Sequence, residues 1–166
     1  MCGIVGIYNK YSINKYSKES LEKAVSCLRH RGPDDTGAVY RANYASAQTR
    51  LSIIDLSWGK QPVHNEDKTF WVSSNGEIFN CVELIEFLRK KGNLFYTESD
   101  TETIVHIYEE YKEKVFDHLN GHFAIAICDS NIKKLVLGRD RSDIFENRRR
   151  IEYETLDKNV ITVPSS

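Results

Sequence analysis

The spacing of apolar residues along the chain predicts three amphipathic helices. Apolar side chains between residues 21 and 28 recur at i, i+3, i+4 and i+7, which places them on one helix face. A second helix is predicted around residues 84–88, and a third runs from Ser99 to about Val115. Ser99 and Glu102 fit a capping box at the start of the third helix.

Further segments have the pattern of β-strands. They cover residues 4–7, 37–41, 45–55, 70–79, 123–128 and 134–139. Residues 123–128 are apolar at every position, so we expect this strand to be covered on both faces. Asn75-Gly76 interrupts the segment 70–79 with a strong short-range hairpin signal. Together the patterns predict an α+β fold, a four-layer αββα sandwich with helices outside two sheets; a two-layer α+β domain is the alternative.

Composition narrows the class of protein. The 166 residues are enough for one domain, and a net charge of −1 favours neither nucleic acid nor a membrane surface as a partner. No segment is apolar for the length of a transmembrane helix, and the start lacks the pattern of a secretory signal. The four cysteines have neither CxxC nor zinc-type spacing, so we expect free thiols and a cytoplasmic protein.

The residue with the most distinctive chemistry is Cys2. Removal of Met1 leaves Cys2 with both a thiol and a free α-amine, which combines a nucleophile and a base in one residue. An α-amine titrates close to physiological pH, so its neutral form can accept the thiol proton. Taken alone, the same residues also fit a buried cysteine on an N-terminal strand.

Other polar residues have plain structural interpretations when each is taken alone. Arg50 lies on the more polar face of its predicted strand, where it either projects into a cleft or remains a surface cation. Asp100 fits the first turn of a helix, where the macrodipole favours a carboxylate. The histidines show no metal-binding spacing, so no metal site is expected, and His106 and His118 are expected to be exposed or packing residues.

Several motifs between residues 2 and 141 resemble, in order and spacing, those of the class II glutamine amidotransferases. The glutaminase domain of that family has the N-terminal-nucleophile hydrolase fold, and this chain is similar to the glutaminase half of asparagine synthetases. The matching stretches are Cys2-Gly3-Ile4-Val5-Gly6, His30-Arg31-Gly32-Pro33-Asp34-Asp35, Arg50-Leu51-Ser52-Ile53-Ile54-Asp55-Leu56, Gly59-Lys60-Gln61-Pro62, Asn75-Gly76-Glu77-Ile78-Phe79-Asn80, Ser99-Asp100-Thr101-Glu102 and Gly138-Arg139-Asp140-Arg141.

The resemblance implies hydrolysis of glutamine to glutamate and ammonia through a thioester on Cys2, with the Cys2 α-amine as the base. It implies that the Asn75 side-chain amide and the Gly76 backbone N–H stabilise the tetrahedral oxyanion. No cofactor or metal ion is expected for this step.

The resemblance also implies which residues bind the substrate. Arg50 is expected to bind the α-carboxylate of glutamine, because a planar guanidinium suits bidentate carboxylate binding. Asp100 is expected to bind the α-ammonium group, with a further polar contact from Glu77 and a backbone contact from Ile53.

The likeness ends near residue 141, which predicts a glutamine amidotransferase type 2 domain at residues 1–141 and a divergent tail at 142–166. The tail lacks the strand that usually follows the Gly-Arg-Asp-Arg motif, so we expect an exposed sheet edge. The family's synthetase domain, which uses ATP and magnesium to make asparagine from aspartate, is expected to be absent. The ammonia would then pass to a separate synthetase chain, or the domain would form a homo-oligomer.

Two other functions stay open at this point. The chain could be a non-catalytic truncated remnant or an interaction module that retains the fold. It could also be an N-terminal-nucleophile hydrolase of another amide, although Arg50 and Asp100 favour a substrate with an amino-acid head.

Overall fold

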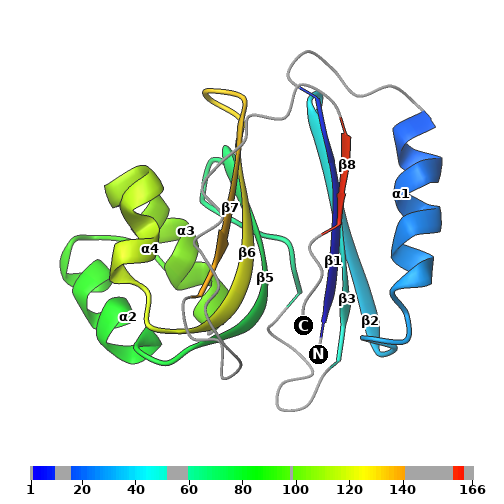
Figure 1. Cartoon of the computed structure of the whole chain (residues 1–166). Helices are drawn as coiled ribbons and strands as arrows, with labels where there is room; N and C mark the ends of the chain where they lie inside the picture. The colour runs from blue at the N-terminus through cyan, green and yellow to red at the C-terminus, as the bar shows by residue number, and fades with distance from the viewer. Residues whose placement is uncertain (1, 10–15, 52–59, 98, 141–158, 163–166) are drawn as a thin grey trace.

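The computed structural model describes residues 2–9, 16–51, 60–97, 99–140 and 159–162. They form two four-stranded sheets that face each other, with a helical layer outside each sheet (Figure 1). Sheet A has the order β2 (Asp35–Tyr40), β3 (Tyr44–Arg50), β1 (Gly3–Tyr8) and β8 (Asn159–Thr162). Sheet B has the order β4 (Val63–His64), β5 (Phe70–Ile78), β6 (Gly121–Asp129) and β7 (Lys134–Arg139).

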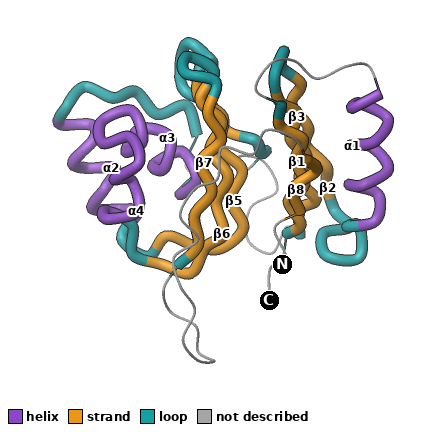
Figure 2. Tube along the Cα trace, turned by 45° about the horizontal axis from the view of Figure 1, so that its top comes forward, coloured by secondary structure: helices purple, strands orange, loops and turns teal. Residues whose placement is uncertain are grey.

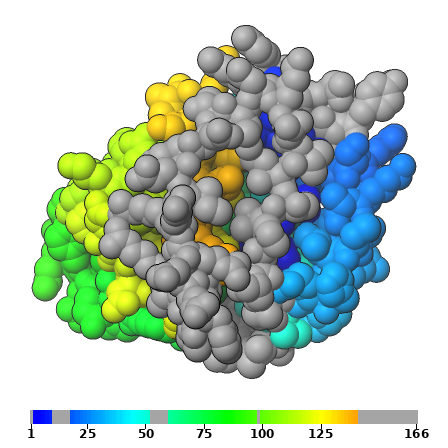
Figure 3. Space-filling view, in the orientation of Figure 1, coloured from blue at the N-terminus to red at the C-terminus, as the bar shows by residue number. Residues whose placement is uncertain are grey.

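All strand pairs in both sheets are antiparallel. The helices are α1 (Tyr16–Cys27), α2 (Cys81–Lys90), α3 (Asp100–Tyr111), the 3₁₀ turn η1 (Lys112–Lys114) and α4 (Val115–His118). α1 covers sheet A, and the other helices lie on sheet B (Figure 1). In the space-filling view, the blue segment that contains α1 and the green segment that contains α2 and α3 lie on opposite sides of the molecule (Figure 3). The predicted four-layer αββα sandwich is confirmed, and the two-layer alternative is excluded.

Each helical layer is held by the apolar face that the sequence pattern predicts. On sheet A, Leu21 of α1 packs against Val5, Ala45 and Ala47, and the small alanines let the helix approach the strands closely. On sheet B, Leu84 and Leu88 of α2 belong to the larger core beneath α3. The members of that core are Val63, Phe70, Val72, Ile78, Leu84, Leu88, Ile104, Val105, Ile107, Tyr108, Val115, Phe123, Ile125, Ile127 and Val136.

Strand β6 confirms the expectation that it is covered on both faces (Figure 2). Phe123, Ile125 and Ile127 belong to the core beneath the helices, whereas Ala126 and Cys128 pack in the cluster between the two sheets. An apolar residue at every position is what a strand between two layers requires.

The space between the sheets changes character along β3. At one end Tyr44 packs with Tyr8 and Cys128 in an apolar cluster. Toward the other end, Ser46 Oγ lies 3.1 Å from Ser73 Oγ, and Gln48 Nε2 donates to Ser74 O at 2.9 Å. The polar face of β3 therefore lies against sheet B, and the polar end of the space between the sheets is the end where β1 begins.

Several predictions about single elements are wrong, and the first concerns Asn75-Gly76. β5 runs without interruption through both residues, which pair with Ala124 and Phe123 of β6. A hairpin is unnecessary because Gly76 adopts a φ of 138° inside the strand, a conformation that glycine tolerates.

The third helix is shorter than its apolar pattern predicts, and its first turn differs in detail. Lys112 has a φ of 52°, which ends α3 before Val115 and starts a separate short turn. Ser99 is the N-cap, and its side chain accepts from Thr101 N. The capping box is wrong, however, because the Glu102 carboxylate accepts from the backbone N–H groups of residues 96 and 97 instead.

Two further strands lie where the sequence predicts none. The segment before residue 69 contains β4, two residues that pair with Val72 and Trp71. In the tail, β8 pairs with residues 5–8 of β1, so this edge of β1 has a partner along four residues. Residues 52–55 of the strand expected at 45–55 lie outside the described residues, and β3 ends at Arg50.

Candidate active site

The predicted site residues from sheet A lie at the end of sheet A where β1 begins. Gly3 pairs with Thr49, so Cys2 comes opposite Arg50 when the antiparallel register is continued by one residue. Ser46 and Gln48 of β3 contact sheet B, and strand alternation gives Arg50 the same face. Cys2 and Arg50 therefore lie together at the polar end of the space between the sheets.

The loop before β2 packs directly on the Arg50 backbone. Pro33 forms a parallel bridge with Arg50, and Asp34 N donates to Arg50 O at 3.1 Å. A Cβ atom on Gly32 would lie 2.6 Å from backbone atoms of Arg50, so only glycine permits this approach. Arg50 is half-buried and has a further interaction partner, so it is not a free surface cation.

Sheet B places Asn75 against the start of β1. Ser73 and Asn75 are on the β5 face that looks toward sheet A, and Asn75 Oδ1 accepts a hydrogen bond from Cys2 N at 3.1 Å. Because a backbone N–H needs an oxygen as its acceptor, this bond also orients the amide: Oδ1 is toward Cys2 N, and Nδ2 is directed elsewhere. Asn75 Nδ2 can therefore donate to a ligand bound beside Cys2.

Gly76 presents its backbone N–H on the side of β5 away from β6. Ser74 N donates to the Gln61 side chain at 2.6 Å and Ile78 N donates to Asp100 Oδ2 at 3.0 Å, so both point away from β6. Backbone N–H groups alternate in direction along a strand, so the Gly76 N–H points to the same side. β4 does not extend to Gly76, which is exposed.

Asp100 reaches the same end of β5 from the first turn of α3. Its Oδ2 accepts from Ile78 N, two residues beyond Gly76. Glu77 lies between them in sequence, and strand alternation puts its exposed side chain on the Asn75 face. The structure thus brings Cys2, Asn75 and Gly76 together. Asp100 lies near them through its contact with Ile78. Ile53 lies outside the described residues.

Sequence reasoning missed a glutamine that joins the loop before β4 to both β5 and α3. Gln61 Oε1 accepts from Ser74 N, and Gln61 Nε2 donates to Thr101 Oγ1 at 3.1 Å. Gln48 donates to the carbonyl of the same Ser74, so side chains from two elements satisfy this part of the edge of β5. The only sequence signal was that Gln61 belongs to one of the matching motifs.

Two of the other three cysteines, Cys81 and Cys128, are poor candidates for a nucleophile. All four cysteines are free thiols. Burial raises the pKa of the Cys81 thiol, and the carboxylates of Asp100 and Glu83 raise it further. Burial alone raises the pKa of Cys128 well above its usual range. Only a thiolate is strongly nucleophilic, so neither group competes with Cys2.

Comparisons with known proteins identify the family. A family model described as "Glutamine amidotransferase domain" matches residues 1–145. Asparagine synthetase [glutamine-hydrolyzing] 1 of Bacillus subtilis is 38% identical over 162 residues, which is 96% of this chain and 25% of that protein. The asparagine synthetase [glutamine-hydrolyzing] of Zea mays is 40% identical over 140 residues, which is 84% of this chain and 24% of that protein. The chain thus spans about a quarter of the length of these relatives.

Solved structures agree on the fold. The glutamine phosphoribosylpyrophosphate amidotransferase from B. subtilis superposes with a TM-score of 0.68 at 18% identity, over 84% of this chain and 37% of that one. A structure titled as the allosteric regulatory enzyme of purine biosynthesis has a TM-score of 0.70 at the same identity, 18%, and the same coverage, 84% and 37%. None of the helices in the described segments is long and apolar enough to span a membrane. With the family model matching most of its length, this chain belongs to the class II glutamine amidotransferases and has their N-terminal-nucleophile hydrolase fold.

Proposed function

We propose that this domain hydrolyses glutamine to glutamate and ammonia, with Cys2 as the nucleophile after removal of Met1. The observation that carries this proposal is the hydrogen bond from Cys2 N to Asn75 Oδ1 at 3.1 Å. It puts the first residue of the processed chain beside the side-chain amide and backbone N–H that an acyl-transfer site needs.

In the proposed reaction, the neutral α-amine of Cys2 takes the thiol proton, and the thiolate attacks the side-chain amide carbon of glutamine. The resulting oxyanion accepts hydrogen bonds from Asn75 Nδ2 and Gly76 N–H. The amine then returns the proton to the leaving nitrogen, so ammonia departs and a thioester remains. Water hydrolyses the thioester to glutamate and restores the thiol. The step uses no cofactor.

We propose that the α-carboxylate and α-ammonium groups of glutamine lie between Arg50 and Asp100. Arg50, opposite Cys2, binds the α-carboxylate. Asp100, at the end of β5, binds the α-ammonium group with help from Glu77. Ile53 is included from the family resemblance, as a backbone contact.

We further propose that the ammonia serves asparagine synthesis from aspartate, as the names of the relatives suggest. ATP and magnesium would act on a synthetase domain or chain that accepts the ammonia. The whole assembly would then be a ligase, and we propose that it is cytoplasmic. A homo-oligomer is the other arrangement we consider.

The proposal is tested by glutamate release from glutamine with the wild type, Cys2→Ala and Cys2→Ser, after mass spectrometry has established the N-terminus. We expect activity only where Met1 is absent and Cys2 is present, because both the thiol and the free amine are needed. A retained Met1 with full activity, or a Cys2→Ala variant as active as the wild type, contradicts the mechanism. Preference for an amide without α-amino and α-carboxylate groups contradicts the substrate.

A further inference from the structure

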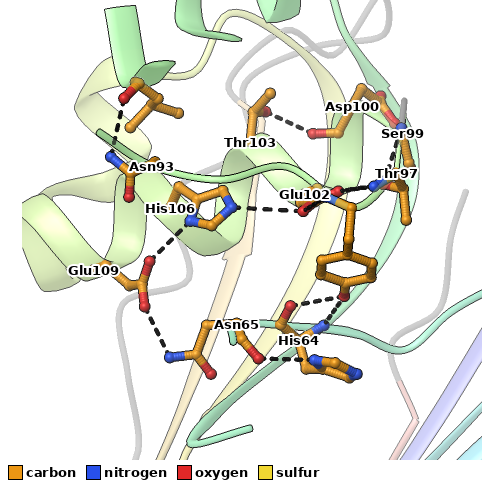
Figure 4. A network of polar contacts seen from close by, with 12 residues as sticks. His64, Asn65, Asn93, Thr97, Ser99, Asp100, Glu102, Thr103, His106 and Glu109 are labelled. Atoms are coloured by element: carbon orange, nitrogen blue, oxygen red, sulfur yellow. Dashed lines mark hydrogen bonds and ion pairs between the residues drawn. The ribbon is translucent and has the colours of Figure 1, made fainter. Parts of the chain in front are cut away.

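A buried imidazole lies between two carboxylates on α3, on the helix side of sheet B (Figure 4). His106 Nδ1 is 2.9 Å from Glu109 Oε2, and His106 Nε2 is 3.6 Å from Glu102 Oε1. The side chains of His106 and Glu102 are both 0% exposed. The ring of Phe95 packs on the imidazole at 4.7 Å. Carboxylates are costly to bury unless they are paired, so this arrangement needs a positive charge on His106.

The pKa values of these three groups agree with a positive charge on His106. Burial by itself lowers the pKa of His106, but the interactions with the Glu102 and Glu109 carboxylates outweigh it and raise the pKa to about 9. Burial by itself raises the pKa of Glu102 and Glu109, but the interaction with His106 and the hydrogen bonds from neighbouring groups hold both below their usual range. The exposed Glu66 and Asp67 add negative charge nearby.

Glu66, His106 and Glu109 have ligand atoms within 4.8 Å of one another, a spacing that also fits a metal ion. An imidazolium has no lone pair to offer a metal, however. The cluster is therefore an ion-pair network at neutral pH. Its contacts show which segment of the chain it holds in place.

What the network holds is the segment that leads into α3. The Glu102 carboxylate accepts from Tyr96 N at 2.8 Å, from Thr97 N at 2.7 Å and from the Thr97 hydroxyl. Thr97 Oγ1 in turn accepts from Ser99 N at 3.2 Å, and Ser99 caps the helix. The His106–Glu102 ion pair and the hydrogen bonds that Glu102, Thr97 and Ser99 make thus join the buried imidazole to the first turn of α3.

The first turn of α3 meets the candidate active site. Asp100 accepts from Ile78 N at the end of β5, and Thr101 accepts from Gln61, which also bonds Ser74 N. On its other side the network reaches β5 through Glu109, which accepts from Asn65 Nδ2 at 2.8 Å. Asn65 Oδ1 accepts from Phe70 N, where β5 begins.

We propose that His106 is a positioning residue for substrate binding. By pairing with Glu102 and Glu109, it holds the first turn of α3 against β5 and so sets the place of the Asp100 carboxylate relative to Gly76. The inference rests on the proposed function, in which Asp100 binds the α-ammonium group of glutamine. Since His106 acts on a group that binds substrate rather than on the reacting atoms, its loss should affect KM more than kcat.

The test compares His106→Gln with His118→Gln, which replaces a histidine that stacks on Tyr111 outside this network. We expect His106→Gln to raise the KM for glutamine about tenfold and to change kcat less than about twofold, because a misplaced binding group costs affinity first. The His118→Gln control should leave both constants unchanged. Glu102→Gln, which keeps an oxygen for the loop N–H groups but removes the charge, should raise KM in the same direction and serves if His106→Gln does not fold.

Amide hydrogen exchange provides a readout that does not depend on activity. We expect the Ile78 amide to exchange faster in His106→Gln, while Val72 and Ile127 in the core of sheet B keep wild-type rates. A folded variant with unchanged KM and unchanged Ile78 exchange overturns the proposal. A variant in which all amides exchange faster, and in which kcat and KM change by the same factor, also overturns it. Failure of the proposed function has a different signature: the processed wild type releases no glutamate, whereas Ile78 exchange still responds to the substitution.

Discussion

At the scale of single residues, Gly76 combines two constraints that only glycine satisfies. Its φ of 138° lies in a region that side chains disfavour, and a Cβ atom there would lie 1.9 Å from the carbonyl oxygen of His122 on β6. The same conformation keeps β5 paired with β6 while its exposed N–H points away from β6, toward the side where Asp100 binds Ile78.

We predict that Gly76→Ala lowers the free energy of unfolding by about 2–4 kcal/mol, through backbone strain and overpacking together. Urea denaturation measures the change. Gly92→Ala is the matched control, because Gly92 has a φ of 97° but a Cβ atom added there would have nothing within 4 Å. Its cost should be that of backbone strain alone, about 1 kcal/mol. Equal losses in the two variants contradict the close-contact explanation.

Asn75 has two polar side-chain atoms with separable roles. Its Oδ1 accepts from Cys2 N, and its Nδ2 is the proposed oxyanion donor. Asn75→Asp keeps an oxygen for Cys2 N and removes the donor. We predict a fall in kcat of about 10²–10³ with a smaller change in KM, measured by glutamate release. A kcat close to that of the wild type rules out the donor role.

At the scale of elements, α3 joins the helical layer to the candidate active site. Its apolar residues Ile104, Val105 and Ile107 bury the helix against sheet B, so the charges of Glu102, His106 and Glu109 lie in the same protected layer. A single helix thus provides core packing, an internal ion-pair network and the Asp100 carboxylate at its first turn.

The raised pKa of His106 predicts a pH dependence of stability. Because the folded pKa is about 9 and the unfolded one about 6.5, the stabilisation is fully present below pH 6.5 and is lost as the pH rises through 9. The full difference corresponds to about 3 kcal/mol. Glu102 and Glu109 have lowered pKa values, so their stabilisation is present above about pH 4.5 and is lost toward lower pH.

Urea unfolding at intervals between pH 6 and pH 10 measures the alkaline loss. His106→Gln should be less stable than the wild type at pH 6 and should show a much smaller decline from pH 6.5 to 9. A decline of the same size in both proteins would assign it to other groups.

At the scale of the whole molecule, the candidate site depends on the meeting of strands from two different sheets. Sheet A supplies Cys2 and Arg50, and sheet B supplies Asn75, Gly76 and Glu77. The layers (Figure 2) keep these strands opposite each other, since each sheet is covered outside by helices and inside by the other sheet. Sheet A itself extends beyond β1 to β8, from the divergent tail.

We predict that deletion of residues 159–166 destabilises the domain and promotes self-association, because β1 then has an unpaired edge. The loss should be about 2–4 kcal/mol, from several ladder hydrogen bonds of about 1 kcal/mol each. Urea unfolding and sedimentation measure the two effects. Deletion of residues 163–166 alone, which keeps β8, is the control and should leave stability nearly unchanged.

Much of the fold could be predicted from local patterns. Apolar spacing located α1 and α2, the fully apolar residues 123–128 indicated a strand between two layers, and motif order identified the family. These features are local because each depends on the periodicity of one segment or on residue identity. Predictions failed where a backbone conformation depends on distant contacts, as at Gly76, Lys112 and β4.

The sequence by itself determined the layer type, the cysteine that can become an N-terminal nucleophile and, through the family resemblance, the candidate residues for binding glutamine. Only the tertiary structure decided that Asn75 Oδ1 accepts from Cys2 N, that the Gly76 N–H faces away from β6, and that His106 is buried between carboxylates. The physical reason is that a hydrogen bond between residues 73 positions apart, or the burial of a charge, depends on which strands and helices pack together. That packing is a property of the whole chain and has no signal in any one segment.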